Sequence, residues 1–228
     1  MTIRPASDRS LLVTFGAGIS VESHHQVFHL TRSLAGLRGI LNLHPAYSSV
    51  LIEFDARLVS GESIEALVHQ KMAAGWEPEL RETSRVVEIP VQYGGEFGPD
   101  LEDVARHTGL SPERVVELHS SAEYLVYFLG FAPGFAYLGG LPPELTTPRI
   151  SAPRKQVPAG SVAIGGNQTG VYPIVSPGGW RLIGRTSVKL FDPTAAEPVL
   201  LQMGDRLCFV ASTGGARLGD TSLSTKGA

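Results

Sequence analysis

Cysteine and lysine are scarce in this chain of 228 residues, which contains one Cys and only 4 Lys among its 19 basic residues. A single Cys208 excludes a disulfide framework within one chain. Its place in the apolar run 207–210 favours a buried, inert thiol over a nucleophile. The formal net charge is only −3 and no run of Lys and Arg is present, which argues against nucleic acid as a partner.

Long apolar runs are missing too. No stretch approaches the roughly 18 to 20 apolar residues of a membrane span, and the N-terminal sequence MTIRPASDRS lacks the apolar core of a signal peptide. With 43% hydrophobic and 18% charged residues, the composition is typical of a globular protein. We therefore expect a soluble protein of a reducing cytoplasm, without a membrane partner.

Familiar catalytic signatures are absent. The chain has no G-x-S-x-G elbow, no H-E-x-x-H and no Cys/His spacing of a zinc site, so no metal is expected. The Gly-rich stretch GGNQTG at 165–170 lacks the Lys of a Walker A loop and is expected to form a turn. His24 and His25 fall on a predicted helix, where neighbours point about 100° apart. We expect both at the surface rather than around a shared metal.

The first third of the chain alternates between strand and helix patterns. A helix is expected to begin after Ser20, an N-cap residue type, and a second one after residue 61. The expected strands are 10–15, 40–43, 50–54 and 85–93, and the expected helices are 20–34 and 62–74. The order strand, helix, strand, strand, helix, strand is typical of a split βαβ, ferredoxin-like unit.

The rest of the chain changes character after residue 93. Two short helices are expected, one with an acidic start at Asp100 and one with Ser111 as N-cap and Pro112 as its first residue. The expected strands that follow are 124–129, 161–164, 170–174, 180–184, 188–191 and 206–210. Many short strands separated by Gly and Pro are typical of a β-barrel. We therefore predict an α+β protein with domains at 1–93 and 94–228, and a loose tail from about residue 216.

Glycine and proline are concentrated in one segment. Residues 124–186 contain 11 of the 26 Gly and 8 of the 16 Pro, so much of this backbone needs fixed or left-handed dihedral angles. Gly lets a backbone approach a ligand closely, and the interleaved Phe131, Phe135, Tyr137, Tyr172 and Trp180 offer flat apolar walls. A β-rich domain whose turns need Gly and Pro has the same composition, so composition alone leaves both interpretations open.

Polar groups of the same segment point to an anionic ligand. Pro148-Arg149 and Pro153-Arg154 place an Arg on stiffened backbone, which limits the entropy lost when a guanidinium binds a carboxylate or phosphate. Ordinary surface charge is the alternative. Other candidates for charged, amide or hydroxyl contacts are Lys155, Asn167, Gln168, Ser176, Arg181 and Arg185.

His119 ends the helix that leads into this segment. It would stabilise the C-terminus of that helix as a cation, or act as an acid or base in a pocket, and both interpretations stay open. Apart from His119, the segment offers no carboxylate, Lys or Cys that is an evident nucleophile. A pocket without a reaction centre indicates half of an active site.

Residues 91–210 carry long and unusual motifs, among them GFAPGFAYLGGL, VPAGSVAIGG and SPGGW. On these motifs the chain resembles the family called allophanate hydrolase subunit 1, whose better-supported members are described as the B subunit of 5-oxoprolinase (PxpB), with the kinase inhibitor KipI as a close relative. The N-terminal region agrees in length and pattern only. The family usually has an aspartate in a V-x-Y-D-G turn, where this chain has Gly94.

The resemblance implies a small α/β N-terminal domain followed by a cyclophilin-like β-barrel domain with a helical lead-in. It implies two partners, a homologous cyclophilin-like C subunit together with an A subunit, in a complex where ATP drives the opening of 5-oxoproline to glutamate. A chain of this kind is expected to be inactive alone. The alternatives are a carboxyltransferase-type role, as in urea carboxylase, and a KipI-like inhibition of a sensor histidine kinase.

The resemblance also guides the choice of site residues. Phosphorylation of the lactam oxygen would make its carbonyl a better electrophile, and cationic groups would hold the developing charge. We predict His119 and Arg154 as catalytic residues. The predicted substrate-binding residues are Phe135, Tyr137, Gln168, Tyr172 and Trp180, with Gly134, Gly178 and Gly179 contributing through backbone geometry.

Overall fold

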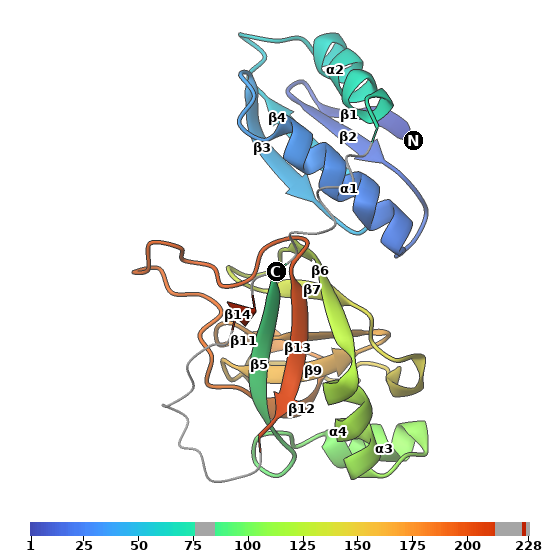
Figure 1. The fold of residues 1–228 in the computed structure, drawn as a ribbon, viewed down its shortest axis with the longest axis vertical. Helices are drawn as coiled ribbons and strands as arrows, with labels where there is room; N and C mark the ends of the chain where they lie inside the picture. Colours follow the sequence, from blue (N-terminus) through green and yellow to red (C-terminus); the bar gives the residue numbers. More distant parts are fainter. Residues whose placement is uncertain (76–84, 213–224, 227–228) are drawn as a thin grey trace. The chain divides into compact units, whose positions relative to one another are not determined.

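The computed structural model describes residues 1–75, 85–212 and 225–226. The chain divides into two compact units, one up to residue 82 and one from residue 83 (Figure 1). None of the helices in these described ranges is both long enough and apolar enough to cross a membrane.

The first unit is a four-stranded antiparallel sheet with two helices. Its strand order is β1-β2-β4-β3, and helix α1 packs on β3 and β4 while α2 packs on β2. The element bounds are β1 (Thr2–Ser7), β2 (Ser10–Thr14), α1 (Val21–Leu34), β3 (Ile40–Pro45), β4 (Ser49–Phe54) and α2 (Gly61–Ala73).

Local signals in the sequence explain these elements. The hydroxyl of Ser20 accepts a hydrogen bond from the backbone N–H of Ser23 at 3.1 Å, so Ser20 is the N-cap that the sequence predicts. The alternation of β4 is confirmed, because Val50, Ile52 and Phe54 all point into the core. The predicted place of His24 is wrong, because this side chain is buried in α1 with its ring beside Phe28.

The predicted strand order of this unit needs a correction. Strand β1 was not predicted, because its residues are almost all exposed and show no alternating burial. It pairs with β2 through a tight hairpin and fills the edge position that the last strand of a split βαβ unit would take. The predicted strand 85–93 corresponds to β5 (Val86–Tyr93), which lies in the second unit. The division between the units therefore falls at residues 82–83 and not at 93–94.

The second unit is a closed barrel of seven strands, so the predicted β-barrel is confirmed. The order is β12-β9-β10-β7-β6-β13-β5, and pairing of β12 with β5 closes the ring. All pairs are antiparallel except β13 with β5, which run parallel side by side (Figure 1). The remaining bounds are β6 (Glu123–Leu129), β7 (Ala136–Gly139), β9 (Ser161–Gly165), β10 (Gln168–Val171), β12 (Arg181–Arg185) and β13 (Arg206–Ala211).

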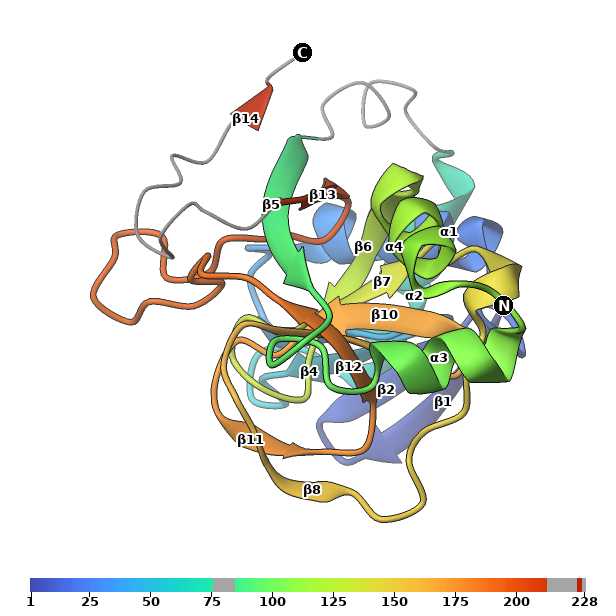
Figure 2. The same cartoon turned by 90° about the horizontal axis from the view of Figure 1, so that it is seen from below.

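Further elements surround the barrel. Helices α3 (Leu101–Thr108) and α4 (Pro112–Ser121) lie together at one end (Figure 1), where α4 packs on β13 and α3 on β12. Strands β8 (Arg154–Val157) and β11 (Ser176–Gly178) pair with each other outside the barrel strands (Figure 2). A short 3-10 helix spans Pro143–Leu145, and β14 (Thr225–Lys226) pairs with β5.

Some predictions for this unit are confirmed and others are wrong. GGNQTG forms the predicted turn, the β9–β10 hairpin, with Gly166 at a φ of 68°. Strands β7, β8 and β11 were not predicted, and residues 188–191 form no strand, because only Phe191 makes a bridge, to Val199. Cys208 is half-buried rather than buried, since it alternates with the inward-pointing side chains of β13. The predicted tail lies outside the described residues except for 225–226.

Candidate functional site

An aromatic cluster covers part of the outer face of the barrel. The side chains of Ala163 on β9 and Leu182 on β12 pack with Phe135, Tyr172 and Trp180. Their neighbours along the strands, Val162, Ile164 and Ile183, belong instead to the barrel core. Successive strand residues point to opposite faces of a sheet, so the cluster lies outside the barrel.

The aromatic residues that the sequence singles out do come together here. The ring of Phe135 is the centre of the cluster, with ring centroids 5.7 Å from Tyr172 and 5.8 Å from Trp180. Tyr137 lies 5.0 Å from the same ring and Phe131 5.4 Å from it. The contacts of Phe135 with all four rings are edge-to-face, the arrangement that aromatic pairs favour.

Two of the three predicted glycines have a steric reason to be glycine. A Cβ on Gly178 would stand 2.4 Å from the hydroxyl oxygen of Tyr172. Gly134 has a φ of 79°, and its Cβ would stand 2.8 Å from the Cβ of Phe191. Gly179 differs, because the nearest atom to its Cβ would be 3.5 Å away on Pro153, an ordinary contact. Gly134 and Gly178 therefore allow the backbone to pass close to other groups.

Positive charge lines this cluster. The guanidinium carbon of Arg149 lies 5.8 Å from the centre of the Trp180 ring, in a cation–π contact. Gln168 pairs with Gly165, whose Cβ would stand 2.5 Å from that same ring, so Gln168 and Trp180 share one side of the β9–β10 hairpin. Burial raises the pKa of Tyr172, which keeps its hydroxyl neutral.

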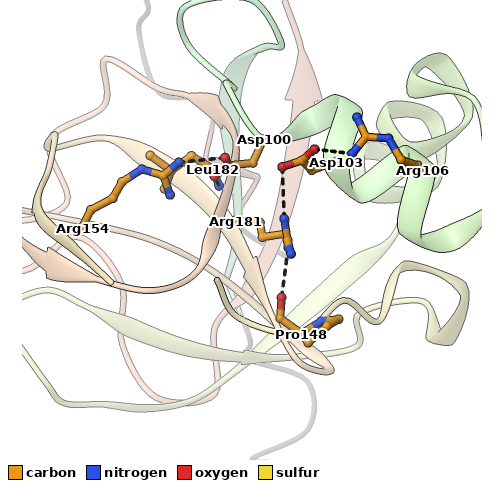
Figure 3. A network of polar contacts seen from close by, with 7 residues as sticks. All are labelled: Asp100, Asp103, Arg106, Pro148, Arg154, Arg181 and Leu182. Atoms are coloured by element: carbon orange, nitrogen blue, oxygen red, sulfur yellow. Dashed lines mark hydrogen bonds and ion pairs between the residues drawn. The ribbon is translucent and has the colours of Figure 1, made fainter. Parts of the chain in front are cut away.

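Arg154 is tied to the start of α3 by Asp100. One carboxylate oxygen of Asp100 accepts a hydrogen bond from Nη2 of Arg154 at 2.7 Å, and the other accepts from the backbone N–H of Leu182 at 2.7 Å (Figure 3). Asp100 is buried, and each of its carboxylate oxygens accepts a hydrogen bond, as a buried charge pair requires. The Nη1 atom of Arg154 is buried without a partner among the described residues, so one of its donor groups is unused.

A second ion-pair network lies beside the first. Asp103 accepts a hydrogen bond from Arg106 at 2.7 Å and one from Arg181 at 3.3 Å (Figure 3). Arg181 also donates through Nε to the carbonyl oxygen of Pro148 at 3.0 Å. These contacts join α3, β12 and the loop before Arg149, so they fix the edge of the aromatic cluster.

His119 lies on the other side of the barrel wall. It is fully buried in the barrel core, and its ring stacks on Phe209 with centroids 4.6 Å apart. Nδ1 lies 2.8 Å from the hydroxyl of Tyr93 and Nε2 lies 2.8 Å from Oγ1 of Thr169. Burial lowers the pKa of His119 to about 3, so the ring is neutral and does not act as a cation at the end of α4.

The hydrogen bonds assign the tautomer of this ring. The hydroxyl of Thr169 donates to the carbonyl oxygen of Ala163 at 3.0 Å, so its oxygen accepts from the N–H at Nε2 of His119. Nδ1 then accepts from the hydroxyl of Tyr93. Both ring nitrogens are used, and the structure does not bring His119 together with Arg154. The catalytic role of His119 stays a prediction.

The structure adds features that the sequence did not reveal. A cavity of about 630 Å³ lies between the 129–134 loop and residues 197–203. The GFAPGF motif marks one wall of this cavity, but the other wall has no motif. Phe131 on the motif side is exposed and has a φ of 67°, a strained backbone angle for a residue other than Gly. Among the described residues, buried polar atoms without a hydrogen-bond partner occur on Gln92, Ser161, Ser176 and Arg185 as well as on Arg154.

The described ranges contain no recognisable metal site, and their Gly-rich hairpin does not have the form of a nucleotide-binding loop. These residues include no group of three or more His, Cys, Asp or Glu that could hold a metal ion. GGNQTG is a hairpin between two antiparallel strands, whereas a phosphate-binding loop joins a strand to a helix. The hairpin therefore does not fit ATP.

Comparison with known proteins agrees with this architecture. The family model described as carboxyltransferase domain, subdomain C and D, matches residues 1–201. The crystal structure of TTHA0988 aligns with a TM-score of 0.80 and 41% identity, and covers 91% of this chain. The chain spans 40% of that solved chain. The chain thus has the fold of a carboxyltransferase-type β-barrel protein.

Sequence relatives narrow the class. A protein named as the B subunit of 5-oxoprolinase, from Escherichia coli O157:H7, is 48% identical over 84% of this chain and 87% of its own length. The protein of the same name from Bacillus subtilis (strain 168) is 42% identical over 91% of both chains. The chain belongs to the family of 5-oxoprolinase B subunits. Urea amidolyase from Saccharomyces cerevisiae is more distant, with 25% identity and 12% of its length covered.

Proposed function

We propose that this chain is the B subunit of an ATP-driven 5-oxoprolinase, which opens 5-oxo-L-proline to L-glutamate together with the A and C subunits. The observation that carries the proposal is the identity of 42–48% to proteins named as the B subunit of 5-oxoprolinase, over nearly their full lengths. ATP belongs to the complex in this proposal, and its binding site lies in a partner protein.

The geometry of the outer face supports a binding role. Aromatic rings beside two guanidinium groups, Arg149 and Arg154, suit a small, flat acid such as 5-oxoproline. Among the described residues of the cluster we find no Ser, Cys or Lys paired with a base as a nucleophile would be. A binding surface of this kind supports the proposal that a partner protein completes the active site. Arg154, with an unused donor at Nη1, is the residue we propose to hold the negative charge that develops on the lactam oxygen during the reaction.

The alternatives have less support. A urea carboxylase-type role rests on relatives at 25–26% identity, of which the chain covers only 12–13%. Inhibition of a histidine kinase stays a prediction of the sequence, and no contact in the structure favours it.

The test is a reconstitution. The chain is mixed with its candidate A and C subunits, 5-oxo-L-proline and ATP, and L-glutamate is measured with and without this chain. We expect glutamate only in the complete mixture. Glutamate formed at the same rate without this chain, or none from an assembled complex, would contradict the proposal.

A further inference from the structure

Three polar residues stand in a row across the seam that closes the barrel. In the pairing register, Arg185 on β12 lies directly opposite Ser161 on β9 and directly opposite Gln92 on β5. Directly opposite residues in antiparallel strands place their side chains on the same face, with Cβ atoms roughly 5 Å apart. Ser161 precedes Ala163 of the aromatic cluster by two positions, so the row lies on the outer face and next to that cluster.

All three residues of the row bury a polar atom that has no partner in the described part of the chain. The atoms are Oγ of Ser161, Nε of Arg185 and Oε1 of Gln92, and Ser161 is entirely buried. Buried polar groups in folded proteins are normally hydrogen-bonded, and each exception calls for an explanation. Three neighbouring exceptions in register have a common explanation if a bound molecule supplies the missing partners.

Arg185 gives the row its charge. Its guanidinium carbon lies 5.9 Å from the centre of the Phe97 ring, a contact that orients the group without neutralising it. Arg154, Arg181 and Arg206 each pair with a carboxylate, whereas no ion pair of Arg185 occurs within the described ranges. An unpaired guanidinium with an unused N–H is a binding group for a carboxylate or another anion.

Gln92 restricts the ligand further. Its Oε1 accepts hydrogen bonds and cannot bind an anionic oxygen, so it needs a donor on the ligand. The hydroxyl of Ser161 can donate or accept, so it suits either part of such a ligand. The row therefore matches a molecule that carries a carboxylate and an N–H attached to the same carbon.

We propose that Ser161, Arg185 and Gln92 form a binding subsite for a small carboxylic acid with an N–H next to its carboxylate. Arg185 binds the carboxylate and Gln92 accepts a hydrogen bond from the N–H. Ser161, which lies on the side of Arg185 away from Gln92, also hydrogen-bonds to the carboxylate. Under the proposed function, on which this identification of the ligand rests, the acid is 5-oxoproline, because its carboxylate and its lactam N–H are attached to the same carbon. The three strands hold the residues in place before the ligand binds.

Ligand analogues test the chemistry of the subsite. Isothermal titration calorimetry measures binding of 5-oxo-L-proline, of the lactone acid that has oxygen in place of the N–H, and of 2-pyrrolidinone, which lacks the carboxylate. The titrations use the full chain and the assembled complex. We expect the lactone acid to bind about tenfold more weakly, the value of one hydrogen bond. 2-Pyrrolidinone cannot make the charge-assisted contact with Arg185, so it should bind on the order of 100-fold more weakly than 5-oxo-L-proline.

Variants assign these effects to residues. Arg185→Gln should weaken the binding of 5-oxo-L-proline on the order of 100-fold. Arg185→Lys, which keeps the charge, should recover part of the lost affinity. Gln92→Leu should bind the lactam and the lactone acid equally. The matched control is Arg206→Gln, an exposed Arg on β13 that pairs with Glu123, and it should bind as the wild type does. Thermal unfolding of each variant shows that it is folded.

Three outcomes would overturn the subsite. The first is wild-type affinity for 5-oxo-L-proline in a folded Arg185→Gln variant, and the second is an affinity that falls in Arg154→Gln but not in Arg185→Gln. The third is no binding of 5-oxo-L-proline to either the chain or the complex. The glutamate assay separates this proposal from the proposed function. Binding that depends on Arg185 without glutamate release refutes the reaction and keeps the subsite, whereas glutamate release with Arg185-independent binding refutes only the subsite.

Discussion

The imidazole of His119 is part of a closed chain of hydrogen bonds inside the barrel. Tyr93 donates to Nδ1, Nε2 donates to Thr169, and Thr169 donates to the carbonyl oxygen of Ala163. Burial also raises the pKa of Tyr93, so its proton stays on the hydroxyl. The side-chain polar atoms of Tyr93, His119 and Thr169 all have partners, which is the condition under which a buried polar network stabilises a unique core. We therefore expect His119 to affect activity indirectly, because its network holds β9 in place and the other face of β9 carries the aromatic cluster.

The buried His119 predicts a loss of stability in acid. Its pKa is about 3 in the folded chain and near 6.5 when exposed, so the folded state binds fewer protons between these values. The contribution of this pKa difference to the free energy of unfolding is fully present above pH 6.5 and is lost as the pH falls towards 3. Between pH 6 and pH 4, the free energy of unfolding should fall by roughly 1.4 kcal/mol per pH unit more in the wild type than in His119→Gln. Urea unfolding at several pH values measures this slope, and equal slopes in the two proteins would show that His119 is charged or exposed.

At the scale of elements, α3 is attached to the outer face of the barrel by its first turn. Asp100 caps no helical N–H with its side chain and instead binds Arg154 of β8 and the backbone of Leu182 in β12. One buried carboxylate thus connects a helix, a barrel strand and the β8–β11 pair outside the barrel (Figure 3). The position of Arg154 at the edge of the aromatic cluster depends on this connection.

Removal of that carboxylate is expected to be costly. Asp100→Ala leaves a half-buried guanidinium and a buried N–H without partners, and should lower the free energy of unfolding by about 3 kcal/mol. Asp103→Ala is the matched control on the same helix, because its carboxylate is 43% exposed and its ion pairs should contribute less than about 1 kcal/mol. Urea unfolding of both variants makes the comparison. Similar losses in the two would mean that Asp100 is not the anchor of α3.

Sequence patterns predicted elements better than they predicted how the elements pair. The start of α1 at Ser20 and of α4 at Ser111 depends on hydrogen bonds three residues away, which a local motif specifies. The alternation in β5 shows that one face is buried, but not which sheet buries it, and so this strand was assigned to the wrong unit. The aromatic residues were recognisable because they lie within one segment. The row of Gln92, Ser161 and Arg185 was not, because only the register of three strands brings those residues together.

At the scale of the whole molecule, the two units differ in how the chain completes them. The first completes its open sheet with the N-terminal β1–β2 hairpin, which places β1 at one edge. The second needs β5, which pairs with β13 along its length and closes the ring on β12. A strand near the middle of the chain is therefore the first element of the barrel, and the boundary between units has consequences for folding.

This boundary predicts how fragments of the protein behave. The fragment of residues 83–228 retains β5 and should unfold cooperatively on heating, whereas the fragment 94–228 should not. The shorter fragment loses Val87, Ile89 and Val91, which are all fully buried. Burial of three such side chains contributes about 5 to 9 kcal/mol, which is comparable to the whole stability of a domain. Circular dichroism during heating distinguishes the two fragments. A cooperative transition in 94–228 would show that the barrel closes without β5, and would return the boundary to residue 93.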